Sequence, residues 1–276
     1  MHVVVTLDEL RLARSQLKEP VGLVPTMGFL HAGHLSLIKQ AHQEVASVVV
    51  SIFVNPAQFG PHEDLEKYPR DLERDLLLLE AACVDLVWTP TKEIMYPAGY
   101  QTWVNVDEVS KLLEGAMRPG HFRGVATVVA KLFNAVQPQR AYFGQKDAQQ
   151  SVVIHQMSQD LDFPVEVVVC PIVREPDGLA MSSRNVYLSA PERKAAVVLS
   201  RSLFQAKAAF EKGARDADHL RKLVQETLET EPLVKLQYVS CADPDTLQEI
   251  EGQVDQAVLS LAVSIGKTRL IDNVLL

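Results

Sequence analysis

The stretch VGLVPTMGFLHAGHLSLIKQAH, residues 21–42, joins a strand-like run to a helix through a turn that carries two histidines. The apolar run at 21–26 predicts a buried strand, and residues 35–46 place Leu35, Ile38 and Val45 on one stripe of a helix. In an open parallel sheet, ligands bind beyond the carboxyl ends of the strands. The strand predicted here, counted as the first of the chain, would end at about Thr26 and open onto such a site.

The turn itself has the features of an anion site. A helix that begins at Gly33-His34 would present unpaired N–H groups and a partial positive charge to a phosphate. Gly28 and Gly33 let the backbone approach closely, and His31 and His34 can donate hydrogen bonds to phosphate oxygens. A structural histidine pair is the alternative that this pattern leaves open. Zinc is disfavoured, because no third ligand lies at a useful spacing except His42.

Composition restricts the class of protein. The chain has 276 residues, 47% of them hydrophobic, which is enough for a sizeable core. A formal charge of -8 argues against a nucleic-acid partner. The N-terminus lacks the apolar segment of a signal peptide, and no run approaches the length of a membrane span, so we expect no membrane partner and a cytoplasmic location. Residues 115–146 contain no Asp or Glu, which suits either a polyanion pocket or a basic surface face.

The three cysteines do not form a recognisable site. Cys83, Cys170 and Cys241 are odd in number, lie far apart in the sequence and belong to no CxxC pair. Neither a disulfide framework nor a structural zinc site is supported. We expect all three to be buried, reduced thiols.

Strand-like and helical segments alternate through the first part of the chain. Short β-branched runs are separated by longer segments with helical periodicity, which predicts an α/β protein with a Rossmann-like, doubly wound, mostly parallel sheet. The predicted strands are 21–26, 47–54, 85–90, 141–144 and 165–173, and the predicted helices are 35–46, 69–82, 122–136 and 147–161.

The pattern changes after about residue 173. A turn-rich connection at 174–194 leads to helical segments at 191–212 and 216–230, followed by strand-like runs at 234–243, 256–266 and 268–276. We therefore expect a nucleotide- and substrate-binding domain at 1–173 and a smaller α+β C-terminal domain, acting as a lid, at 174–276.

Five segments together resemble the pantothenate synthetase family, which belongs to the nucleotidyltransferase α/β superfamily with the HxGH motif. They are PTMGFLHAGH (25–34), IFVNPAQFGP (52–61), RPGHFRGVATVV (118–129), FGQKDAQQ (143–150) and MSSRN (181–185), in the family's order. The last resembles the KMSKS element of the superfamily but lacks its lysines, so Arg184 would carry the positive charge alone.

The resemblance implies an activity. It implies ATP-dependent condensation of pantoate with β-alanine to pantothenate, AMP and pyrophosphate, through an enzyme-bound pantoyl adenylate. The expected cofactor is Mg²⁺ with ATP, the partners are these small molecules, and the expected assembly is a homodimer. Asp71, Glu73 and Asp75 lie near the expected place of the metal, but no ligand is assigned among them.

The resemblance also implies residue roles. The expected catalytic residues are His31, His34, Lys146 and Arg184. The expected ATP-binding residues are Met27, Gly28, His31, His34, Gly144, Lys146, Asp147, Val173, Met181, Ser182, Ser183 and Arg184. The expected pantoate-binding residues are Gln58, Gln150, Pro25, Met27, Phe53, Val125 and Val129. The expected β-alanine-binding residues are Gln58, Asn55, Arg118 and His121.

Two other functions compete with this interpretation. The HxGH motif alone fits a nucleotidyltransferase of the same superfamily, and the synthetase-like segments also fit a binding protein that has lost its chemistry. Gln58, Gln150 and the RPGHF segment favour acyl activation over the first. The acidic charge balance, the lack of an anticodon-type appendage and the intact HxGH, Lys146 and Arg184 set count against the second.

Overall fold

The computed structural model describes residues 1–61 and 63–276, and these residues form two compact units. Unit 1 contains Met1–Gly144 and Val153–Pro171, and unit 2 contains Gln145–Val152 and Ile172–Leu276. The second unit is thus discontinuous in sequence. The two-domain boundary expected at 173 remains a prediction.

Unit 1 is built on a parallel sheet of six strands. Their order is β1-β4-β3-β2-β5-β6, and every pairing in it is parallel, which confirms the predicted sheet. β1, missed in the sequence, precedes β2, so the strand that ends at Thr26 is not the first of the chain. The strand order reverses where β2 pairs with both β3 and β5, which makes this the switch point at which such sheets bind ligands. The strands are β1 (His2–Val4), β2 (Val21–Thr26), β3 (Ser47–Ile52), β4 (Leu86–Trp88), β5 (Arg140–Gly144) and β6 (Glu166–Cys170).

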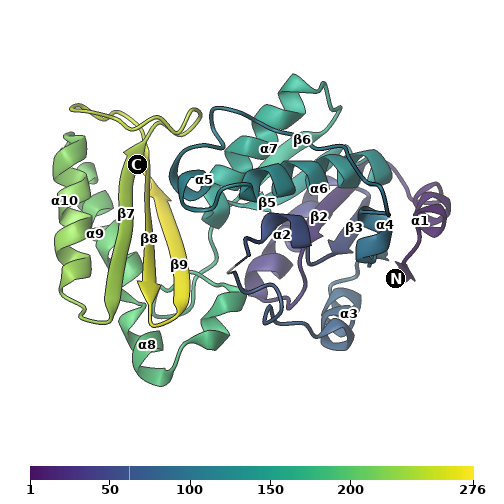
Figure 1. Ribbon diagram of the computed structural model, residues 1–276, viewed down its shortest axis with the longest axis horizontal. Coiled ribbons are helices and arrows are strands. Elements are labelled where there is room, and N and C mark those ends of the chain that lie inside the picture. Colours follow the sequence, from purple (N-terminus) through teal and green to yellow (C-terminus); the bar gives the residue numbers. More distant parts are fainter. Residues whose placement is uncertain (62) are drawn as a thin grey trace. The chain divides into compact units, whose positions relative to one another are not determined.

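Helices cover the sheet of unit 1 because their apolar stripes pack onto its β-branched residues. Leu37 and Ile38 of α2 and Leu79 of α3 join Val24 and Val50 of the strands in one buried cluster. In Figure 1, β2 and β3 lie between α6 and α3. The helices are α1 (Leu7–Arg14), α2 (Ala32–Glu44), η1 (Pro56–Gln58), α3 (Leu72–Ala81), α4 (Lys92–Met95), α5 (Leu113–Met117), α6 (His121–Val136) and α7 (Ala148–Asp160), whose first residues belong to unit 2.

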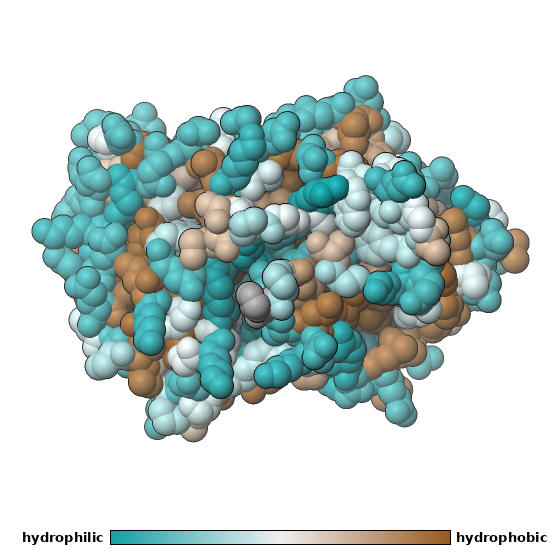
Figure 2. Space-filling model, viewed as in Figure 1, coloured by the Kyte–Doolittle hydropathy of each residue, from teal (hydrophilic) through white to brown (hydrophobic). Residues whose placement is uncertain are grey.

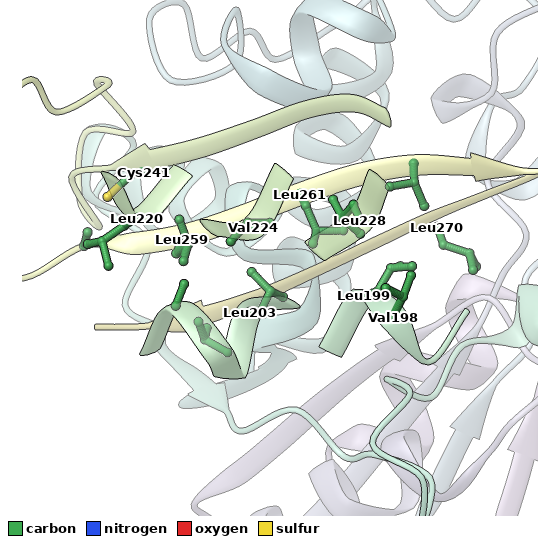
Figure 3. Close-up of a cluster of buried hydrophobic side chains, with 14 of the residues drawn as sticks. Val198, Leu199, Leu203, Leu220, Val224, Leu228, Cys241, Leu259, Leu261 and Leu270 are labelled. Atoms are coloured by element: carbon green, nitrogen blue, oxygen red, sulfur yellow. The ribbon is translucent and has the colours of Figure 1, made fainter. Parts of the chain in front are cut away.

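Unit 2 is a smaller α+β unit. Three antiparallel strands, in the order β7-β8-β9, pack against α9 and α10, and Figure 3 shows Leu203, Leu220 and Val224 of these helices beside Leu259 and Leu261 of β8. The single helix expected at 191–212 is two helices, α8 and α9. The elements are η2 (Gln145–Asp147), η3 (Ser183–Tyr187), α8 (Ala190–Ala195), α9 (Val198–Glu211), α10 (Ala217–Glu229), β7 (Val234–Ala242), β8 (Val258–Ile265) and β9 (Thr268–Leu275).

The surface is mainly polar on the face shown in Figure 2, where apolar residues form separate small patches. Among the described residues, no helix has the length and apolarity needed to traverse a bilayer. Cys170 and Cys241 are buried free thiols, as expected, but Cys83 is exposed, so the expectation of three buried cysteines is wrong for this one. Cys83 follows Ala82, the C-cap of α3, and has a left-handed backbone conformation with φ 56° in the exposed turn at the end of this helix.

Candidate active site

The two histidines of the HxGH motif cap helix α2. Nδ1 of His31 accepts a hydrogen bond from the N–H of Gly33 at 3.1 Å, and Nδ1 of His34 accepts one from the N–H of His31 at 3.3 Å. The helix begins at Ala32 with His31 as its N-cap, earlier than the start expected at Gly33-His34. His42, the only further zinc ligand considered, instead has Nε2 2.9 Å from the carbonyl oxygen of Ala82.

These contacts determine which ring nitrogen of each histidine carries the proton. A neutral imidazole has one donor and one acceptor nitrogen, and Nδ1 is the acceptor in both rings. The proton of each ring is therefore on Nε2, which makes Nε2–H the donor of His31 and of His34. The first turn of α2, described in full, contains no acidic residue, so the helix N-terminus and the two donors together favour an anion.

A buried carboxylate shapes the loop before these histidines. Asp75 of α3 accepts the N–H groups of Phe29 at 2.6 Å and of Leu30 at 2.8 Å. Gly28 has φ 80°, and a Cβ there would lie 3.1 Å from Oδ2 of Asp75. Burial raises the pKa of Asp75, although the two backbone hydrogen bonds and the charge of Arg74 act in the opposite direction. Since each carboxylate oxygen accepts a backbone N–H group, Asp75 stabilises the conformation of the loop before the histidines.

The sequence did not predict this role of Asp75. Its position had suggested only the neighbourhood of a metal, together with Asp71, whose side chain caps α3 by accepting the N–H of Arg74 at 3.1 Å. Within residues 1–61 and 63–276, no group of three His, Cys, Asp or Glu side chains could hold a metal ion. A buried acid in the otherwise apolar run DLLLL, residues 75–79, was the available signal.

Gln58 and Asn55 lie together at η1, beside α6. Asn55 is 1% exposed and Gln58 is 9% exposed, and Nδ2 of Asn55 donates to Oε1 of Gln58 at 3.1 Å. Nε2 of Gln58 lies 3.1 Å from the sulfur of Met27. The helix and η1 approach so closely that a Cβ on Gly124 would lie 2.2 Å from the carbonyl oxygen of Ala57. The structure thus brings together two of the predicted substrate amides and Met27.

The predicted apolar wall residues also belong to unit 1. Phe53, Val125 and Val129 are buried, and the two valines are four residues apart on one face of α6. Pro25 and Met27 are partly buried at and just beyond the end of β2. Burial of this kind fits both a pocket wall and ordinary packing.

Arg118 is the C-cap of α5 and His121 is the first residue of α6, and Arg118 binds a carboxylate. Nε and Nη2 of Arg118 donate to the two oxygens of Glu63 at 2.7 and 2.6 Å. Nδ1 of His121 lies 2.8 Å from the carbonyl oxygen of Gln58, and its Nε2 lies 3.1 Å from Nη1 of Arg118. Burial, followed by the charge of Arg118, lowers the pKa of His121 to about 4. His121 is therefore neutral at pH 7 and accepts at Nε2, and Arg118 has the geometry for bidentate carboxylate binding.

In unit 2 the turn that carries Lys146 is held by the last strand of the chain. Nδ2 of Asn273 in β9 donates to the carbonyl oxygens of Gln145 at 2.9 Å and of Lys146 at 3.1 Å. Nζ of Lys146 lies 3.7 Å from a carboxylate oxygen of Asp147. Gln150 follows on the first turn of α7, also in unit 2, whereas Gly144 ends β5 in unit 1.

The MSSRN segment lies in the same unit as Lys146. Ser182 is the N-cap of η3, and its Oγ accepts the N–H of Arg184 at 3.2 Å. The N–H of Met181 donates to the carbonyl oxygen of Val173 at 3.0 Å, so these two predicted ATP-binding positions are paired. Ser183 is buried and Arg184 is partly buried. The predicted residues are thus gathered in two sets, one within each unit.

Comparisons with known proteins match the chain to one family over almost its whole length. The family model described as pantoate-beta-alanine ligase matches residues 2–275. A pantothenate synthetase of Herpetosiphon aurantiacus is 61% identical over 277 residues, which covers 100% of this chain and 100% of that protein.

The chain is also similar to solved structures of this family. The crystal structure of pantothenate synthetase from Thermus thermophilus is similar with a TM-score of 0.95, at 50% identity over 99% of each chain. A pantoate-beta-alanine ligase from Francisella tularensis, crystallised with beta-gamma ATP and beta-alanine, has a TM-score of 0.82 and 35% identity over 100% of this chain and 97% of that one.

Proposed function

Because the chain belongs to the pantoate-β-alanine ligase family, we propose that it condenses pantoate with β-alanine and consumes ATP. In the first step a carboxylate oxygen of pantoate attacks the α-phosphorus, and pyrophosphate leaves. In the second step the amine of β-alanine attacks the acyl carbon of the adenylate, loses a proton, and AMP leaves. The family membership favours this function over a nucleotidyltransferase or a non-catalytic relative. The single observation that supports it best in the structure is the pair of histidine donors at the start of α2.

Donors aimed at phosphate oxygens supply the chemistry of the first step. Negative charge builds on the α-phosphate oxygens in the transition state, where Nε2–H of His34 and the ammonium group of Lys146 would each stabilise it. A preorganised donor of this kind contributes on the order of 3 kcal/mol. His31 would bind phosphate oxygens in the ground state, and Arg184 would hold the leaving pyrophosphate with its planar guanidinium. No protein nucleophile is needed for either step.

The remaining ATP contacts are proposed from the family motifs. They are Met27, Gly28, Gly144, Asp147, Val173, Met181, Ser182 and Ser183. Mg²⁺ would enter as part of the substrate MgATP, because it binds phosphates and retains water in most nucleotide sites. The described residues offer no three-ligand cluster of their own for it.

The two acid substrates would be bound by amides and by Arg118. We assign pantoate to Gln58 and Gln150 with Pro25, Met27, Phe53, Val125 and Val129 as walls. Arg118, which holds Glu63 bidentately, would take the carboxylate of β-alanine in the same way. His121 would orient Arg118. With a pKa of about 4 and its acceptor nitrogen turned to Arg118, it is not the base that accepts the amine proton at neutral pH.

Exchange of labelled pyrophosphate into ATP tests the adenylating step. With MgATP and pantoate present and β-alanine omitted, the protein should exchange label, and omission of pantoate should stop the exchange. Lys146→Ala and His34→Ala should each reduce the rate by about 100-fold, the loss typical of a removed transition-state donor. The control is Lys212→Ala, an exposed lysine that follows α9. Exchange without pantoate would contradict the proposal.

Assembly and location are also proposed. A homodimer predicts a mass of twice 30.6 kDa in light scattering. The cytoplasmic location remains the expectation from the sequence.

A further inference from the structure

The side chain of Asn55 uses all of its hydrogen-bonding capacity inside the protein. Its Nδ2 donates to Oε1 of Gln58 and to the carbonyl oxygen of Gly124, both at 3.1 Å. Its Oδ1 accepts the N–H of Ala57 at 3.2 Å and the hydroxyl of Tyr96 at 2.8 Å. An asparagine amide has two donor hydrogens and two acceptor lone pairs, so all four positions are occupied.

This network fixes the orientation of two amides in succession. The carbonyl oxygen of Gly124 can only accept and the N–H of Ala57 can only donate, so the Asn55 amide has one orientation. The NH₂ group of Asn55 then donates to Gln58, so the atom of Gln58 that accepts this hydrogen bond must be Oε1. The NH₂ group of Gln58 is thereby turned to the side of Met27, whose sulfur is only a weak acceptor. Gln58 is left as a donor for substrate oxygens.

Tyr96 is held rigidly at the far end of this network. It follows α4, its ring stacks on Trp103 with centroids 5.9 Å apart, and Tyr100 and Phe53 lie against it at 5.1 and 6.3 Å. Burial raises the pKa of Tyr96, so the hydroxyl keeps its proton and donates to Asn55 over the whole working pH range.

We propose that Tyr96 is a positioning residue for pantoate, acting through Asn55 to fix the donor orientation of Gln58. The inference rests on the proposed function, in which Gln58 binds pantoate. It also gives Asn55 a different task from the direct β-alanine contact expected from the sequence, because its four polar positions are already filled by protein groups.

The test compares Tyr96→Phe with Tyr100→Phe. Tyr96→Phe removes only the hydroxyl and should raise KM for pantoate about fivefold, the effect of one lost neutral hydrogen bond, with KM for ATP unchanged. Tyr100→Phe changes a neighbouring ring whose hydroxyl has no hydrogen-bond partner in the described part of the chain, so its KM values should stay those of the parent protein.

A double-variant comparison separates positioning from general packing. If Tyr96 acts through Gln58, adding Tyr96→Phe to Gln58→Ala should leave KM for pantoate unchanged. An undiminished increase in the Gln58→Ala background, or equal increases in KM for pantoate and ATP, would overturn the inference. So would a Tyr96→Phe protein with parental constants. Absence of pantoate-dependent exchange in the parent protein would instead count against the proposed function itself.

Discussion

The carboxylate of Asp75 holds the backbone that leads into both motif histidines. Its two acceptor contacts, to the N–H groups of Phe29 and Leu30, determine the course of a loop in which Phe29 has φ 52°, a value uncommon for residues other than glycine. The position of His31 and His34 therefore depends on a residue more than forty positions further along the chain.

Asp75→Asn tests this dependence. The amide offers only one acceptor oxygen, so one buried N–H loses its partner and the free energy of unfolding should fall by about 1–3 kcal/mol. Pyrophosphate exchange should fall as well, because the loop that orients the histidines loosens. The matched control is Asp85→Asn, since Asp85 also accepts a backbone N–H, that of Val48 at 2.7 Å, away from the loop. Equal exchange rates in the two variants would refute the role of Asp75.

His121 makes stability depend on pH. Its pKa is lowered from 6.5 to about 4 in the folded protein, so between these values the unfolded chain binds more protons than the folded one. Stability should therefore be complete above the unfolded pKa and should decline as pH falls toward 4, by about 2 kcal/mol at pH 5 relative to pH 7. Urea unfolding of the parent protein and of His121→Gln at both pH values measures this. The prediction fails if the substitution leaves the pH dependence unchanged.

At the scale of elements, helix α6 and η1 approach more closely than side chains normally allow. Gly124 is the residue that permits the contact, because a Cβ there would meet the carbonyl oxygen of Ala57 at 2.2 Å and the N of Gln58 at 2.7 Å. Both of these atoms belong to the backbone, so they cannot move away by a change of side-chain rotamer. The placement of Asn55 and Gln58 against α6 depends on this absence of a side chain.

Gly124→Ala should separate α6 from η1. The helical gain from alanine, at most about 1 kcal/mol, is smaller than an overpacking cost of about 3 kcal/mol, so the free energy of unfolding should fall by about 2 kcal/mol. Thermal unfolding measures the loss, and KM for pantoate should rise with it. Gly60→Ala is the control, because a Cβ at Gly60 makes only ordinary contacts at 3.7 Å or more. A parental melting temperature for Gly124→Ala would contradict the close approach.

The sequence predicted long, periodic elements well and short ones poorly. The parallel sheet and the helices α2, α6 and α10 were recognisable because each has a sustained apolar pattern. β1 has three residues, too few for a pattern, and α1 has a polar surface, although the capping box between Thr6 and Glu9 marks its start. For the site, motifs indicated the candidate residues, but they did not indicate that Gln145–Val152 groups with the C-terminal unit. Tyr96 and Asn273 could not be found, because their contacts join distant parts of the chain, and the role of Asp75 was signalled only by an acid within an apolar run.

At the scale of the whole molecule, unit 2 is assembled from two separate parts of the sequence. The segment Gln145–Val152 groups with Ile172–Leu276. The side chain of Asn273, near the end of the chain, joins the two parts by donating a hydrogen bond to the carbonyl oxygen of Gln145. Nearby, Arg174 pairs with the buried Asp272 at 2.7 and 2.9 Å and donates to the carbonyl oxygen of Asn273 at 3.2 Å. The lysine of the proposed first step thus depends on a strand that is remote in sequence.

Asn273→Asp tests that dependence. The substitution replaces the donor that bridges two carbonyl oxygens with a negatively charged acceptor, which repels them. We expect the pyrophosphate exchange rate to fall by roughly 10- to 100-fold, the effect of a small misplacement of a catalytic group. Asn134→Asp, which removes a single donor to the carbonyl oxygen of Ala130 on α6, serves as the control. Parental exchange in Asn273→Asp would show that the turn keeps its position without this contact.

The link between Asn273 and the lysine turn also has a consequence for the chain during translation. Lys146 leaves the ribosome 127 residues before Asn273 does. At 5–20 residues per second, this delay amounts to roughly 6–25 s. Once Cys170 has been synthesised, the nascent chain contains all six strands of the parallel sheet, whereas the turn that carries Lys146 still lacks its hydrogen bonds to Asn273. A chain that ends before residue 273 therefore contains every strand of the parallel sheet but lacks the side chain that holds the turn carrying Lys146.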